Sequence, residues 1–324
     1  MRKHTHLLLA LAVVLLMPLL MQSGSLASEV LIFGLAAMGC NLLLGFTGLL
    51  SFGQGIFFGL GSYTIALTLT RWPLPMPLAL TLAVVVGALG AAVVGWVAIR
   101  QKGTYFVMLT LAFAQMFYFV AYTATGITGG DNGLLDIPRP SLALFGQVLW
   151  PLTSPWQFYS FVAVIFMAAF WLLLKVSRST FGRTLLAVRD NEERAGAIGY
   201  NLKLLKLQAF VISGAVTGLA GALHAMMTGI APLSNAEYHT SEMILVMTVI
   251  GGTGNLFASV LGSAFYILLG DWLSSLWPRW LLLLGLVLIA ISLWMQRGLW
   301  GLGEKLWGLV RGKRHAAGSK GEQA

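Results

Sequence analysis

Three polar side chains, Thr47, Ser51 and Gln54, stand among six glycines in the mostly apolar residues 45–63. Their hydroxyl and amide groups are uncharged and offer hydrogen bonds. A glycine in a helix interior costs about 1 kcal/mol relative to alanine, so a continuous helix through this stretch is unfavourable. The pattern therefore predicts a broken or re-entrant segment.

A second glycine-broken stretch, residues 250–262, carries Thr253 and Asn255. Both stretches contain the pattern Thr-Gly-x-Leu, which is a weak indication of an internal repeat. Paired interruptions are typical of membrane transporters, because non-helical backbone at membrane depth persists only inside protein or beside a cavity. Two interpretations stay open for Thr47, Ser51 and Gln54. They line a polar path, or they bond neighbouring helices and only fix the packing.

The composition defines the class of protein. Of the 324 residues, 58% are hydrophobic and 10% are charged. Soluble domains carry about 25% charged residues, so we expect a polytopic membrane protein. The formal charge of +9 does not indicate nucleic-acid binding, because the basic residues lie at the ends of apolar runs and in the C-terminal tail. The single cysteine, Cys40, is expected to be a small buried packing residue.

Ten apolar stretches could form membrane segments, although the eighth is too short to span comfortably as an ideal helix. They lie at about residues 7–22, 29–46, 52–69, 78–99, 104–123, 157–175, 207–228, 241–252, 255–270 and 279–296. We therefore predict an all-α transmembrane helical bundle of about nine or ten segments. Residues 1–28 would be an N-terminal membrane segment, residues 29–296 the transmembrane domain with a polar loop at 176–206, and residues 297–324 a basic tail.

The basic residues also predict an orientation. If the chain starts in the cytoplasm and alternates, every lysine and arginine except Arg71, Arg139 and Arg279 falls on the cytoplasmic side. Both termini are then cytoplasmic, and the eighth and ninth stretches must be separate segments. The N-terminus also resembles a signal peptide, with a basic start, an apolar stretch and a Ser-Leu-Ala site, so cleavage is an open alternative.

Small residues recur four positions apart in three stretches, which predicts close contact between helices. The three stripes are Ser51, Gly55 and Gly59; Gly87, Ala91 and Gly95; and Gly214, Gly218 and Ala222. Tight packing is the simplest interpretation of each stripe, but it does not account for the polar residues beside the first.

The titratable residues indicate no catalytic, metal or cofactor site. No acidic residue falls in the middle of a predicted span, and His224 lies near the outer end of its stretch. The histidines are scattered, and there is no Gly-x4-Gly-Lys-Ser/Thr loop for a nucleotide. A proton-driven carrier usually needs an intramembrane ionisable residue, whereas sodium coupling through backbone carbonyls stays open. If ATP drives this protein, it must act through another chain.

The polar loop at 176–206 could receive such a chain. Leu185, Val188 and Ala195 alternate with charged residues, and Gly199 follows as a typical helix stop. A short amphipathic helix of this kind can dock into a groove of a soluble partner. It can equally lie at the membrane surface against anionic lipid, and the sequence pattern does not decide between the two.

Four longer stretches carry a family resemblance. They are NLLLGFTGLLSFGQGIFFGLGSYTIA (41–66), RQKGTYFVMLTLAFAQM (100–116), GITGGDNGLLDIP (126–138) and GRTLLAVRDNEERAGAIGYNLKLLKLQAFVISGAVTGLAGAL (182–223). With them, residues 29–293 resemble the permease subunits of bacterial ABC importers for branched-chain amino acids, within a wider group that handles amino acids and amides such as urea. A histidine is common in that family where Gln54 stands, so a family role at this position is in doubt.

The resemblance implies a set of partners and roles. A second, homologous permease would complete the pore in the bacterial inner membrane, two cytoplasmic ATP-binding subunits would drive it, and a periplasmic binding protein would deliver the substrate. The coupling element would comprise Arg189, Asp190, Asn191, Glu193 and Gly199, with ordinary surface charges as the alternative. The path candidates would be Thr47, Ser51, Gln54, Thr253 and Asn255.

The remaining expectations concern the outer face and the substrate. Gly129, Gly130, Asp131 and Asn132 would shape the surface where the binding protein docks, unless they are a simple surface turn. The chain itself would hold no cofactor and catalyse no reaction. The alternatives are a permease for urea or short amides and, less favoured, an ion-coupled secondary transporter or a membrane enzyme.

Overall fold

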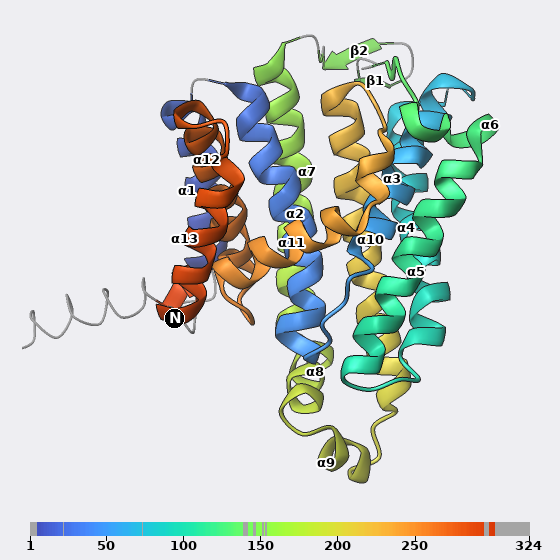
Figure 1. The fold of residues 1–324 in the computed structure, drawn as a ribbon, viewed down its shortest axis with the longest axis vertical. Coiled ribbons are helices and arrows are strands. Elements are labelled where there is room, and N and C mark those ends of the chain that lie inside the picture. Colours follow the sequence, from blue (N-terminus) through green and yellow to red (C-terminus); the bar gives the residue numbers. More distant parts are fainter. Residues whose placement is uncertain are drawn as a thin grey trace, which may run out of the picture.

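The computed structural model describes residues 5–21, 23–72, 74–138, 142–144, 147–150, 152, 154–294 and 298–301. They form a helical bundle (Figure 1), in agreement with the predicted all-α fold. Each of the ten predicted apolar stretches is a helix. These helices are α1 (Thr5–Leu20), α2 (Gly24–Thr47), α3 (Gln54–Thr70), α4 (Met76–Ala98), α5 (Thr104–Thr123), α7 (Pro155–Arg178), α10 (Leu202–Thr228), α11 (Tyr238–Gly251), α12 (Leu256–Leu276) and α13 (Trp280–Trp294).

Shorter elements connect the main helices. They are α6 (Thr125–Thr128), the 3-10 turns η1 (Gly130–Asn132) and η2 (Leu233–Ala236), α8 (Thr180–Asp190), α9 (Glu192–Ala197) and the antiparallel strands β1 (Leu142–Leu144) and β2 (Gln147–Trp150). Figure 1 shows α8 and α9 at one end of the bundle and the β1–β2 hairpin at the opposite end. We call these the α8 end and the hairpin end.

Within the described residues, six helices are long and apolar enough to cross a membrane, namely α2, α4, α5, α7, α10 and α12. Helix α1 is attached to the bundle through α7, because the Tyr159 hydroxyl donates a hydrogen bond to the Val14 carbonyl oxygen at 2.6 Å. Most of the predicted basic tail, residues 302–324, lies outside the described residues.

Helix α2 lies at the centre of the bundle. It packs against α7, α10, α11 and α12, and nearly all of its residues are buried. A helix that is apolar on every face is stable only when protein or lipid surrounds it completely. In α2 the surroundings are protein, so its polar residues can meet partners on neighbouring helices.

The second and third predicted stripes of small residues face each other. A Cβ added to Gly87 of α4 would stand 2.6 Å from the carbonyl oxygen of Gly214 and 3.1 Å from the Cα of Gly218, both on α10. Ala91 occupies the adjacent space against Gly214. The two backbones can therefore approach closely, as the spacing predicted.

The first glycine-rich segment is broken, as predicted. Helix α2 ends at Thr47, and Gly48 follows in the left-handed conformation with φ 72°. The chain then runs without helical structure to Gln54, where α3 begins. The Gln54 side chain bonds Ser213 near the middle of α10, so α3 starts inside the bundle rather than at its end.

Helix α11 crosses the bundle instead of running along it (Figure 1). Its first turn lies beside the start of α3, because the Gly55 backbone N–H donates to Ser241 Oγ at 2.7 Å. It has 14 residues and ends at Gly251, and a short connection leads to α12. The eighth and ninth stretches are therefore separate helices, and the eighth does not reach from one end of the bundle to the other.

Candidate functional site: the junction of the broken segments

Asn41 of α2 holds the connection between α11 and α12. Its Nδ2 donates to the carbonyl oxygen of Asn255 at 2.9 Å and to Ser259 Oγ at 2.7 Å, with the Gly252 carbonyl oxygen at 3.4 Å. Its Oδ1 accepts from the Gly254 backbone N–H at 2.9 Å. A buried amide with several partners fixes an irregular backbone, since each unpaired group would cost about 1–3 kcal/mol.

The two predicted interruptions meet at this point. A Cβ on Gly45, in the last turn of α2, would collide with Asn41 Oδ1 and with the backbone of Gly254. Gly254 adopts φ 88°, a left-handed conformation that favours glycine. Glycine in both stretches therefore permits a backbone contact between the two halves of the chain, which the shared Thr-Gly-x-Leu pattern only hinted at.

Arg189 connects this junction to α8. Its Nη1 donates a hydrogen bond to the Gly45 carbonyl oxygen at 2.6 Å. That carbonyl belongs to the last turn of α2, where carbonyls lack helical partners and the helix dipole favours a cation. The Arg189 side chain also covers Gly48 and Gly254: their added Cβ atoms would stand 3.2 Å from its Cγ and 3.5 Å from its Nη1, respectively. One guanidinium thus bonds the first interruption and lies beside the second.

The remaining predicted coupling residues lie on the surface around α8 and α9. Asp190 forms an exposed ion pair with Arg189 at 3.1 Å. Asn191 separates the two helices and caps α9, accepting from the Arg194 N–H at 2.8 Å. Glu193 is exposed, and Gly199 has φ 99° with open space around it. The structure therefore brings Arg189, but not Glu193 or Gly199, to the broken segments.

Glu192 anchors α9 to the rest of the bundle. Its carboxylate is 2.7 Å from the ammonium of Lys206, a buried residue in the first turns of α10, and 3.8 Å from that of the exposed Lys102. A buried lysine retains its charge only when it is paired. Glu192 therefore joins α9 to α10 through Lys206, and to the connection between α4 and α5 through Lys102.

Gln54 belongs to a separate buried network. Its Nε2 donates to Ser213 Oγ at 3.1 Å, and its Oε1 accepts from Thr217 Oγ1 at 2.7 Å. The Ser213 hydroxyl in turn donates to the Gly39 carbonyl oxygen at 2.7 Å. The network joins α2, α3 and α10, so Gln54 serves helix packing in this conformation.

The other path candidates also have local partners. The Thr47 hydroxyl donates to the Leu43 carbonyl oxygen of its own helix, and Ser51 Oγ accepts from the Gly53 N–H. Both are buried. Asn255 caps α12 through the Phe257 N–H, while Thr253 is exposed. Asn255 lies at the junction, and Gln54 does not share hydrogen bonds with it.

The glycine-rich loop after α5, predicted to lie on the outer face, is hydrogen-bonded to the connection after α10. Gly129 and Gly130 adopt φ values of 79° and 63° around η1, and Asp131 and Asn132 are exposed. Leu134, just after this loop, forms a two-bond bridge with Ala231. The loop is thus a defined surface at the hairpin end.

The sequence reasoning missed Asn41, Glu192 and Lys206. A signal for Asn41 was present, because it is a single amide in a long apolar run immediately before the first interruption. Lys206 and Glu192 looked like ordinary charges of the polar loop. Their pairing depends on the fold of α9 against α10, which periodicity does not reveal.

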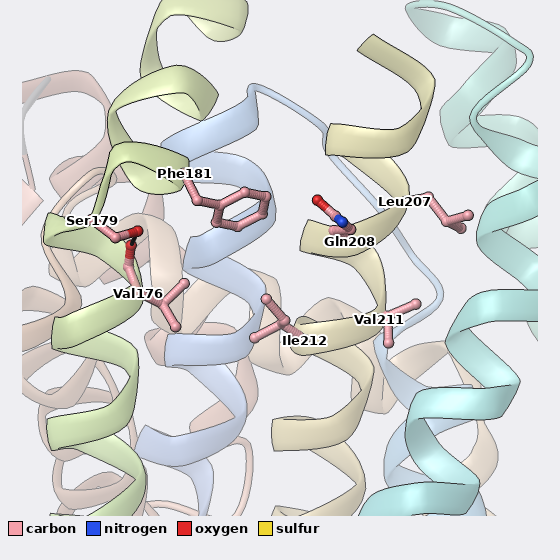
Figure 2. Close-up of a pocket in the computed structure, with 7 residues that line it drawn as sticks. All are labelled: Val176, Ser179, Phe181, Leu207, Gln208, Val211 and Ile212. Carbon is pink, nitrogen blue, oxygen red and sulfur yellow. Dashed lines mark hydrogen bonds between the residues drawn. The ribbon is translucent and has the colours of Figure 1, made fainter. Parts of the chain in front are cut away.

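An apolar groove lies on the side of the bundle near the α8 end (Figure 2). It runs between the α7–α8 corner and α10, with Phe181 and Ile212 projecting into it and Gln208 as its amide-bearing residue. It has no charged lining residue. A solute with charged ends would leave its charges unpaired there, so the groove suits hydrocarbon chains better than an amino acid.

The fold and this junction define a polytopic membrane protein with two broken segments that meet under a polar loop, an arrangement typical of transport permeases. Residues 23–292 match the family described as branched-chain amino acid transport system / permease component, and the chain belongs to that family.

Curated relatives agree with this family. The chain is 26% identical to the high-affinity branched-chain amino acid transport system permease protein LivM of Salmonella typhimurium, with 100% of this chain and 80% of the relative aligned. It is 26% identical to LivM of Escherichia coli K12, over 95% and 76% of the two chains. The autoinducer 2 import system permease protein LsrC of Salmonella paratyphi B is 24% identical over 60% of this chain and 53% of its own. No solved structure matches the chain.

Proposed function

We propose that this chain is a permease subunit of an ABC importer that moves branched-chain amino acids across the bacterial inner membrane. The family and the names of the LivM relatives support this proposal. The structural observation that carries it is the contact of Arg189, in the polar loop, with the two helix interruptions. A subunit driven from outside needs such a connection between the loop and the bundle.

The proposed partners follow from the family. Two ATP-binding subunits would bind the α8 end, a homologous permease would complete the pore, and a periplasmic binding protein would dock at the hairpin end near Asp131 and Asn132. Both termini would be cytoplasmic, since the α8 end then carries the basic residues of α8, α9 and α10. ATP hydrolysis would occur in the partner subunits, and this chain would hold no cofactor.

We infer the following coupling mechanism. Closure of the ATP-binding subunits would move α8 and α9 together, because Asn191 joins them and Glu192 fixes α9 to Lys206. Arg189 would carry that displacement to the Gly45 carbonyl and the adjoining Gly254. The α11–α12 connection would shift relative to α2, and the bundle would change between inward-open and outward-open states.

The experiment uses the assembled importer in proteoliposomes. ATP-dependent uptake of radiolabelled leucine is measured with the wild-type chain, with Arg189→Ala and with Arg183→Ala, an exposed arginine on the same helix. We expect Arg189→Ala to lower uptake about tenfold or more while the ATP-binding subunits still co-purify, because the lost bond lies inside the permease. Arg183→Ala should stay close to wild type.

Three results would contradict parts of the proposal. Wild-type uptake by Arg189→Ala would exclude the coupling role of this residue. Leucine uptake driven by an ion gradient, with the chain alone and no ATP, would support the secondary transporter instead. ATP-dependent uptake of urea but not leucine would favour the short-amide permease.

A further inference from the structure

An acidic residue stands at the start of helix α11, near the middle of the bundle. Glu237 immediately precedes its first residue. A Cβ on Gly55 would stand 2.5 Å from the Glu237 carbonyl oxygen, and the preceding residue, Gln54, bonds Ser213 near the middle of α10. Figure 1 shows α11 crossing the bundle between its two ends. No acidic residue lies in the middle of an apolar stretch of the sequence, yet the fold places Glu237 at mid-depth.

The Glu237 carboxylate meets no cation in the part of the chain that the structure describes. None of the ion pairs found there includes Glu237. The side chain does not cap α11 either. It lies near the Tyr118 hydroxyl of α5 and interacts with it electrostatically. A carboxylate at membrane depth is costly and typically faces a partner, an aqueous cavity or a ligand.

Tyr63 provides an independent observation at the same place. Its residue is 5% exposed, and its hydroxyl is the buried side-chain polar atom without a hydrogen-bond partner among the described residues. One turn earlier on α3, a Cβ added to Gly59 would stand 3.0 Å from the Cα of Ala236 and 3.2 Å from the ring of Phe117. Ala236 directly precedes Glu237 and Phe117 directly precedes Tyr118, and the Tyr63 and Tyr118 hydroxyls also interact electrostatically. An unpaired buried hydroxyl costs about 1–3 kcal/mol, so a phenol retained there needs an explanation such as a ligand.

The cluster is not sealed inside the bundle. Tyr118 and Glu237 are half-buried rather than sealed in the core. Asp131 of the outer loop is exposed and also interacts electrostatically with Tyr118. Asp131, Tyr118 and Glu237 therefore place acidic and phenolic oxygens between the outer loop and the middle of the bundle. Their negative potential favours a positively charged group in this region.

We propose that Glu237, Tyr118 and Tyr63 form a subsite for the α-ammonium group of the substrate during its passage. An ammonium has three N–H donors, which match one carboxylate and two phenol oxygens. The inference rests on the proposed function and narrows it, because urea and other neutral amides bring no charge to offset the carboxylate. The predicted path candidates, by contrast, already have hydrogen-bond partners or, for Thr253, lie exposed.

The test again uses the complete importer in proteoliposomes, with leucine as the probe. Three variants are compared: Glu237→Gln, Tyr63→Phe and the control Glu242→Gln. Glu242 lies on the same helix but is exposed and paired with His239 at 3.3 Å. Uptake, subunit assembly and the thermal unfolding midpoint are measured for each variant. Binding-protein affinity for leucine is measured separately and should not change.

We expect Glu237→Gln to lower uptake about tenfold or more with the subunits still assembled, and Glu242→Gln to stay close to wild type. Tyr63→Phe should lower uptake severalfold while its unfolding midpoint is unchanged or raised, because an unpaired buried hydroxyl has been removed. A purely structural role for Tyr63 would not separate uptake from stability in this way.

The subsite is refuted if Glu237→Gln and Tyr63→Phe both transport leucine like the wild type. It is also refuted if Glu237→Gln releases the second permease, since the carboxylate would then pair with a cation of that subunit. Failure of the wild-type importer to take up leucine with ATP would instead count against the proposed function. The two failures are therefore distinguishable.

Discussion

At the scale of single residues, Asn41 shows what a lone amide does inside a membrane bundle. It forms four hydrogen bonds with residues of the segment 252–259, in the second half of the chain. The side chain compensates the backbone groups that the break between α11 and α12 leaves without helical partners. Asn41 therefore determines where the second interruption lies relative to the first.

Asn41→Ala should lower the free energy of unfolding by about 1–3 kcal/mol, because it leaves the Gly254 N–H and neighbouring carbonyls unpaired in the interior. The thermal unfolding midpoint in detergent measures the effect. Ser259→Ala is the matched variant, since it removes one hydrogen bond and should cost about 0.6 kcal/mol. Equal midpoints for Asn41→Ala and the wild type would show that the connection is held by packing alone.

The polarity of Thr47, Ser51 and Gln54 could be read from the sequence, but their partners could not. The residue type shows that a side chain can form hydrogen bonds, whereas the fold determines which groups are its partners. Thr47 bonds its own helix, and Gln54 bonds two hydroxyls of α10. Whether these side chains meet substrate in another conformation stays a prediction.

At the scale of elements, the glycine contact between α2 and the α11–α12 connection is a site of close backbone approach. Gly45→Ala would place a methyl group against Asn41 Oδ1 and the Gly254 backbone. We expect it to destabilise the protein and to abolish most leucine uptake, since backbone atoms cannot move aside easily.

Gly126→Ala is the control for this substitution, because an added Cβ there meets nothing within 4 Å. It should be neutral in both unfolding midpoint and uptake. An equally neutral Gly45→Ala would contradict the prediction. It would show that the protein folds and transports without close contact between the two interruptions.

Helix positions could be predicted because each apolar run is bounded by polar or glycine-rich residues. The direction of α11 could not, since hydropathy reports the length of a helix and not its path. Only the short eighth stretch indicated that something other than a spanning helix was present. Its crossing orientation follows from contacts with α3, such as the bond from Gly55 to Ser241.

The contact between Arg189 and Gly45 could not be predicted from the sequence either. It joins residues 144 positions apart and involves a backbone carbonyl, which no residue pattern marks. The family resemblance predicts that the loop is the coupling element, but it does not indicate which atom of the bundle the loop contacts.

At the scale of the whole molecule, the α8 end presents exposed apolar side chains on a polar loop. Ile198 is 74% exposed and Tyr200 is 48% exposed beyond the end of α9. Such residues commonly mark a docking surface. Under the proposed function, the ATP-binding subunits would cover them.

Ile198→Asp should therefore weaken co-purification of the ATP-binding subunits about tenfold or more, because a buried charge would oppose docking. The control is Ile127→Asp, which places the same charge on an exposed isoleucine of α6 near the hairpin end. Co-purification that is unaffected by Ile198→Asp would move the docking surface elsewhere on the loop.

The enclosed position of α2 has a consequence for how the protein is made. The residues that bond Asn41 follow it by 211–218 positions, so they are synthesised long after α2 has entered the bilayer. Until then its amide faces lipid or the insertion machinery, and the neighbouring leucines must outweigh that penalty. The sequence of α2 must therefore be stable in two successive environments, first the lipid hydrocarbon during insertion and then the surrounding protein after assembly.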